Sequence, residues 1–153
     1  MIEGRGFDVV AMVHLVVLAL WGGVVATEAV IELLPFRRRE LHSATIRFHY
    51  WIDLLVELPL VIAVVATGAV LFFSLDPITP LHLVKIGFGG AAVAINLFCI
   101  VVVVRRGRKF LREGDDGPLW RASRRVLMCF AVGLLCAAGA AVLGFRLALE
   151  RMG

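Results

Sequence analysis

The chain has 153 residues, of which 61% are hydrophobic and 18% are charged, and its formal net charge at pH 7 is +4. A soluble domain of this length is usually about half apolar, so the composition excludes an ordinary soluble protein and favours an integral membrane protein. The charge is modest, and the basic residues gather between apolar segments, which is typical of topogenic arginines rather than of a nucleic-acid interface.

Four apolar segments predict four transmembrane helices in a single domain spanning 1–153, at about 8–34, 40–74, 81–106 and 118–148. Each contains about 20 or more residues, which at 1.5 Å per residue cross roughly 30 Å of hydrocarbon. Lipid offers the backbone no hydrogen bonds, so runs of this length are expected to be helical. We therefore expect an all-α, integral membrane four-helix bundle.

The first segment carries one polar stripe. At about 100° per residue, His14, Trp21, Glu28 and Glu32 fall within about 40° of one another on a helix. The two acids and the length of the segment argue against a cleavable signal peptide, so we expect it to remain as a helix. It is expected to end near Pro35.

The second segment contains HYWIDLLVELPLV at 49–61, where a histidine and two acids precede a proline. On a regular helix His49 shares a face with Asp53, whereas Glu57 drifts about 80° away from His49. Pro59 should kink this helix, because proline lacks the backbone N–H and its ring crowds the preceding turn.

The third segment places His82, Lys85, Gly89 and Asn96 on one face. The fourth is expected to begin near Pro118 and has no ionisable residue in its core, so it should seal the side of the bundle. The cysteines have no metal-binding spacing and are interpreted as buried thiols: Cys99, Cys129 and Cys136.

The basic residues predict the orientation of the helices. They concentrate in two connections, after the first and third segments: Arg37, Arg38, Arg39 and Arg47, then Arg105, Arg106, Arg108, Lys109, Arg112, Arg121, Arg124 and Arg125. Basic loops remain in the cytoplasm, so both termini are expected outside, with short external loops. We expect a multi-pass protein of a bacterial inner membrane, with anionic lipid headgroups as partners of these loops and no nucleic acid.

Five polar residues are expected to meet in the cytoplasmic half of the bundle, because the first two helices run antiparallel around 36–39: Glu28, Glu32, His49, Asp53 and Glu57. Carboxylates in hydrocarbon need protons, a cation such as Arg47, or a metal. Carboxylate and imidazole groups are ligands of iron, manganese and zinc. Metal ligation, hydrogen bonding by protonated acids and a proton path all remain open.

A second polar group is expected at the external side, formed by His14, His82 and Lys85. Histidines close to the interface can simply be solvated. Two histidines in a small apolar bundle can also bind a haem iron from both sides. Glycines would make room for the macrocycle: Gly22, Gly23, Gly87, Gly89 and Gly90.

Three stretches resemble a known superfamily: HLVVLALWGG at 14–23, LPLVIAVVATGAVLF at 58–72 and TPLHLVKIGFGGAAVAINLF at 79–98. They are similar to the HemJ-type protoporphyrinogen oxidases and the CopD-like copper-resistance membrane proteins. The resemblance implies a four-helix membrane fold, with haem b in one branch and copper in the other. The matching positions are His14, Trp21 with Gly22, Pro59, and His82 with Lys85, although one extra residue separates the last two. The HYWID stretch is not part of the shared pattern.

We therefore expect a haem b-binding redox protein, with His14 as axial ligand and His82 or Lys85 opposite. Trp21 and Gly22 would border the cofactor, and the catalytic groups would be Lys85, Asp53 and Glu57, the acids moving protons. The alternative is a non-haem transition-metal (iron, manganese, zinc or copper) binding or transport protein that uses Glu28, Glu32, His49, Asp53 and Glu57. A third interpretation is a small assembly subunit, as part of a homo-oligomer or a larger membrane complex.

Overall fold

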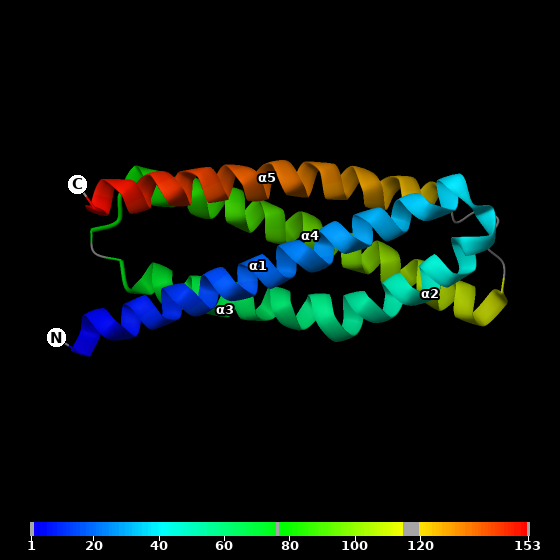
Figure 1. Ribbon diagram of the computed structural model, residues 1–153, viewed down its shortest axis with the longest axis horizontal. Helices are drawn as coiled ribbons and strands as arrows, with labels where there is room; N and C mark the ends of the chain where they lie inside the picture. Colours follow the sequence, from blue (N-terminus) through cyan, green and yellow to red (C-terminus); the bar gives the residue numbers. More distant parts are fainter. Residues whose placement is uncertain (1, 76, 115–119, 153) are drawn as a thin grey trace.

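The computed structural model describes residues 2–75, 77–114 and 120–152, which form helices joined by short connections (Figure 1). The elements in chain order are α1 (Ile2–Arg37), the 3-10 turn η1 (Arg39–Leu41), α2 (His42–Ile52), the π-helical turn η2 (Asp53–Glu57), α3 (Leu58–Phe73), α4 (Pro80–Glu113) and α5 (Trp120–Met152).

Within the described residues, four helical segments are long and apolar enough to cross a membrane: Val9–Arg37, His42–Phe73, Pro80–Glu113 and Ser123–Leu147. This confirms the prediction of an all-α chain with four potential spans. Both termini lie at one end of the bundle, and η1 lies at the other (Figure 1).

Two predicted helix ends differ from the structure, and a third cannot be compared with it. α1 continues through Pro35 to Arg37. A proline in the last turn removes few backbone hydrogen bonds, and the Arg38 N–H still donates to the Leu34 carbonyl at 2.9 Å. α4 runs to Glu113 instead of about 106, and ends where Gly114 adopts a left-handed conformation with φ of 67°. The predicted start of the fourth helix near Pro118 lies outside the described residues.

The kink expected at Pro59 takes the form of the π-helical turn η2, which ends at Glu57, two residues before the proline. Proline would clash with the carbonyl four residues earlier in a regular helix, and the wider π turn relieves this crowding. The wider turn also rotates less per residue, so it brings Glu57 back toward the face of His49. The predicted drift of Glu57 was therefore wrong, and His49, Asp53 and Glu57 are all buried.

The helices pack as two pairs, α1 along α3 and α4 along α5, while α2 contacts both α1 and α4. A small apolar core lies between the pairs, formed by Trp21, Val61, Val64 and Ala92. The large apolar side chains elsewhere are mostly exposed, as expected where a bundle meets lipid. The three cysteines are free thiols and are partly rather than fully buried.

Tyr50 of α2 packs directly against Gly107 of α4, where a β-carbon on the glycine would lie 2.5 Å from Cδ2 and 2.8 Å from Cβ of the tyrosine. Gly107→Ala should therefore destabilise the bundle by about 1–3 kcal/mol through overpacking. Thermal unfolding in detergent micelles measures this effect. Gly90→Ala is the matched control, because a β-carbon there meets nothing within 4 Å; equal behaviour of the two variants would contradict the prediction.

Candidate functional site

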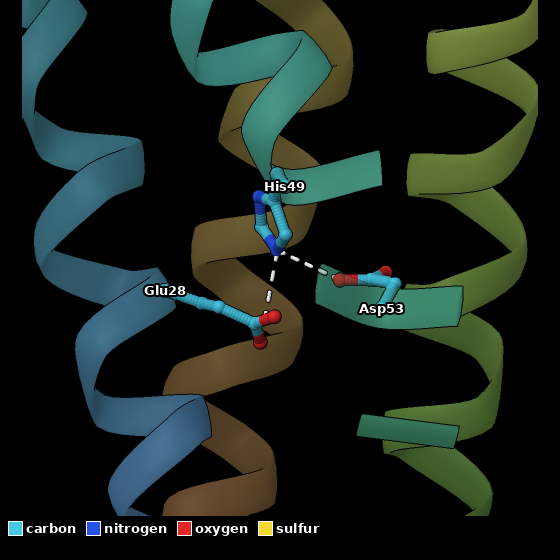
Figure 2. Close-up of side chains that lie close together, drawn as sticks. All are labelled: Glu28, His49 and Asp53. Atoms are coloured by element: carbon cyan, nitrogen blue, oxygen red, sulfur yellow. Dashed lines mark ion pairs between the residues drawn. The ribbon is translucent and has the colours of Figure 1, made fainter. Parts of the chain in front are cut away.

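Three buried side chains from α1, α2 and η2 converge in the half of the bundle away from the termini (Figure 2). The Nε2 atom of His49 lies 3.3 Å from Oδ1 of Asp53 and 3.8 Å from Oε2 of Glu28. One ligand atom of each residue lies within 4.8 Å of the others. We call Glu28, His49 and Asp53 the three-residue cluster.

The opposite ring nitrogen of His49 is held by Glu32, whose Oε2 lies 2.8 Å from Nδ1. A carboxylate oxygen accepts hydrogen bonds, so at this distance Nδ1 carries the proton and donates to Glu32. In the neutral ring, Nε2 then carries a lone pair, and it points between Glu28 and Asp53 (Figure 2). Nη2 of Arg106, which can only donate, also lies 3.4 Å from Nδ1, but the contact with Glu32 is shorter and favours the tautomer with the proton on Nδ1. Metal-binding histidines commonly donate their other nitrogen to a carboxylate in this way.

The cluster contains buried acceptors without donors. In the part of the chain that the structure describes, no N–H or hydroxyl group donates to either carboxylate oxygen of Asp53 or to Oε1 of Glu28, although the carboxyl groups of Glu28 and Asp53 lie within hydrogen-bonding reach of each other. Asp53 is 1% exposed and Glu28 is 4% exposed. Nε2 of His49 approaches Asp53 without meeting hydrogen-bond geometry, so no N–H is directed at this carboxylate. Oxygen atoms and a lone pair therefore face one another, an arrangement that a metal cation or a proton shared between the carboxyl groups would stabilise.

Arg106 of α4 is the cation that neutralises Glu32. Its guanidinium donates to both carboxylate oxygens, through Nη1 to Oε1 and through Nη2 to Oε2 at 2.9 Å. Nη1 also donates to the hydroxyl of Ser123 in α5 at 3.0 Å. This network connects α1, α2, α4 and α5, and two-point recognition of a carboxylate is the geometry for which arginine is suited.

This arrangement corrects two expectations. Arg106 was expected in a cytoplasmic loop, but it is buried within α4. Arg47, the expected partner of the acids, is exposed. One signal was available in the sequence: Val103 lies seven residues after Asn96 and Arg106 three residues after Val103, so Arg106 borders the inward face, although on a regular helix it is about 80° from Asn96.

Glu57 lies beside the three-residue cluster, toward the apolar core. Its Oε1 accepts a hydrogen bond from Nδ2 of Asn96 at 2.6 Å. The carboxyl groups of Asp53 and Glu57 both adjoin that of Glu28, and the indole of Trp21 also neighbours Glu57. The structure therefore brings together all five residues of the predicted inner group, in two layers.

The predicted outer residues are placed separately, beyond the apolar core. Nδ1 of His14 is hydrogen-bonded to the Thr67 hydroxyl at 2.8 Å, and its ring lies against Gly68. Lys85 is an electrostatic neighbour of His14, and its aliphatic chain reaches Gly144 of α5.

His82 lies in the first turn of α4, where Nδ1 accepts from the backbone N–H of Thr79 and pairs with its hydroxyl at 2.7 Å. Gly22 is exposed, as are Gly23, Gly87 and Gly90, and a β-carbon at any of them meets nothing within 4 Å. The room that these glycines leave therefore opens toward the outside of the bundle.

Comparison with protein-family models, with curated proteins and with solved structures found no match. The resemblance to the HemJ and CopD superfamily stays a prediction, and the chemistry of the site has to be argued from its own residues.

Proposed function

We propose that this chain is a multi-pass membrane protein that binds a transition-metal cation between its helices, with Glu28, His49 and Asp53 as ligands. The observation that carries the proposal is the convergence of buried, donor-free carboxylate oxygens on a histidine nitrogen whose lone pair is fixed by Glu32. One imidazole and two carboxylates suit iron, manganese, cobalt or zinc better than a cation bound by oxygen alone.

The spacing of the ligand atoms supports this proposal. Two ligand atoms about 2.1 Å from a tetrahedral zinc ion lie about 3.4 Å apart. The separations of 3.3 Å and 3.8 Å from Nε2 of His49 are close to this value. Glu32 and Arg106 would orient the imidazole from behind without contacting the metal, and the surrounding helices would exclude water from the site.

We also propose that the site lies in the cytoplasmic half of a bacterial inner membrane. Exposed basic residues flank the bundle at the end away from the termini: Arg37, Arg38, Arg105, Arg108, Lys109 and Arg112. The excess of basic residues at this end supports a cytoplasmic position and contacts with anionic headgroups.

Elemental analysis of protein purified without chelators tests the proposed function, together with equilibrium dialysis against Zn²⁺ and Mn²⁺. We expect bound transition metal in the wild type and affinity weaker by about tenfold or more in Asp53→Asn, since the amide keeps an oxygen but loses the charge. Glu113→Gln is the matched control, because this carboxylate is exposed at the end of α4. A wild type that binds neither metal would contradict the proposal.

Haem b remains the competing prediction for the outer residues. His14 and His82 each have Nδ1 engaged, which leaves Nε2 as the atom that a haem iron would use. If haem is bound, the purified protein should show a Soret band that His14→Ala removes. A featureless visible spectrum would leave the inner site as the candidate.

A further inference from the structure

The short helix α2 has two faces of different character. Its buried side chains share the face that packs on the bundle: His42, Thr45, Ile46 and His49. The side chains of the opposite face are exposed: Ala44, Arg47, Phe48, Trp51 and, just beyond the end of α2, Leu55. At about 100° per residue the four α2 members of this second set fall within about 100° of one another. We call the five exposed residues the outer face of α2.

The outer face presents large apolar side chains at a fixed place. Phe48 is 56% exposed, Trp51 is 51% exposed and Leu55 is 67% exposed. The indole of Trp51 meets the ring of Tyr50 edge to face, with centroids 5.2 Å apart, and Tyr50 in turn packs against Gly107 of α4. Trp51 is therefore held next to the contact between α2 and α4. Tryptophan is enriched where a bilayer meets water, because its ring has an apolar body and a polar edge.

Arg47 supplies the charge of this face, one turn from Trp51. The Cα–Cβ bonds of a helix tilt toward its N-terminus, and the N-terminus of α2 lies at the end of the bundle that carries η1 (Figure 1). An arginine at the end of a span extends its guanidinium toward the lipid headgroups and keeps its aliphatic part along apolar surface. A guanidinium also binds phosphate through two parallel N–H groups. The outer face thus places a phosphate-binding group above a surface suited to an acyl chain.

We propose that the outer face of α2 binds an anionic phospholipid, with the phosphate on Arg47 and an acyl chain along Phe48, Trp51 and Leu55. Charge complementarity selects the anionic lipid. In phosphatidylcholine the choline ammonium compensates the phosphate, and it would meet an end of the bundle that is already rich in exposed arginines. The inference rests on the proposed membrane position of this end, and not on the metal.

The lipid surface also sets the depth of the three-residue cluster. His49 lies between Arg47 and Trp51 in the chain and on the opposite face of α2, so it sits close to the headgroup level. Asp53 follows Arg47 by six residues, which corresponds to about 9 Å along a helix. A cation that enters from the headgroup side would therefore reach the cluster over this short distance, without crossing the apolar core.

Quenching of tryptophan fluorescence by brominated lipids tests the surface. The full chain is reconstituted into vesicles of phosphatidylcholine and phosphatidylglycerol, with brominated chains on phosphatidylglycerol in one sample and on an equal amount of phosphatidylcholine in another. The difference between the wild type and Trp51→Phe isolates the signal of Trp51. We expect phosphatidylglycerol to occupy the surface about fivefold more often than phosphatidylcholine at equal mole fraction, which is the factor that one basic residue near a membrane contributes.

Three variants assign the preference. Arg47→Gln should abolish it, whereas Arg47→Lys keeps the charge and should retain most of it. Arg125→Gln is the matched control, because Arg125 is an exposed basic residue carried by α5 instead of α2, and it should behave as the wild type.

The outcomes separate this surface from the other proposals. Equal quenching by the two lipids, a preference that persists in Arg47→Gln, or a loss shared by Arg47→Gln and Arg125→Gln would each overturn the surface and leave the metal site and the membrane position intact. Absence of Trp51 quenching by either lipid would overturn the membrane position of this end as well. Metal binding is measured separately and does not depend on these results.

Discussion

Arg106→Met should destabilise the bundle by about 3–5 kcal/mol, because it leaves the Glu32 carboxylate buried without its cation. Glu32 is fully buried, and both of its oxygens accept hydrogen bonds from the guanidinium, which is its cationic partner. The change also removes the hydrogen bond to Ser123, and with it a connection between α4 and α5. Thermal or denaturant-induced unfolding in detergent micelles, followed by circular dichroism, measures the loss.

Arg105→Met is the matched control, because Arg105 is the neighbouring residue on α4 and its side chain is exposed. It should change the free energy of unfolding by no more than about 0.5 kcal/mol. A second control replaces the pair: Arg106→Met combined with Glu32→Met should recover much of the stability, since apolar replacement of a buried ion pair is often neutral or better. Equal losses in Arg105→Met and Arg106→Met would contradict the role of the ion pair.

The sequence predicted the inner group well because carboxylates within a membrane span face the interior of the bundle rather than lipid. The spacing of Glu28 and Glu32 on one helix, and of His49 and Asp53 on the next, places them on facing stripes once the helices are antiparallel. Only the local rotation of Glu57 was missed. A π turn depends on how the backbone accommodates Pro59, and helical periodicity alone does not reveal it.

Arg106 was missed for a different reason. A run of basic residues after an apolar segment is interpreted first as a loop, and hydropathy gives no means of telling one arginine of the run from another. What distinguishes Arg106 is its angular position, since it borders the face of Asn96 and Val103 and is buried, while Arg105 and Arg108 are exposed. Burial of a charged residue at the end of a span becomes predictable when an unpaired acid lies at the same level on a neighbouring helix, as Glu32 does.

His49→Gln should lower the affinity for Zn²⁺ on the order of 100-fold or more, because it removes the nitrogen ligand of the three-residue cluster. The glutamine retains an oxygen, so the affinity for Mn²⁺, which oxygen ligands suit, should fall much less. The ratio of the two affinities, measured by equilibrium dialysis or by competition with a chelating dye, therefore reports the contribution of the imidazole. A general loss of structure would lower both affinities together.

His42→Gln is the matched control, because His42 is also buried on α2 but lies outside the three-residue cluster. It should leave the preference for Zn²⁺ over Mn²⁺ unchanged, even if it affects stability. Equal shifts of this ratio in the two variants would place the nitrogen ligand elsewhere and contradict the site. A loss confined to His49→Gln would mean that the histidine opening the HYWID stretch serves as a ligand, with its second nitrogen fixed by Glu32 and, through Glu32, by Arg106.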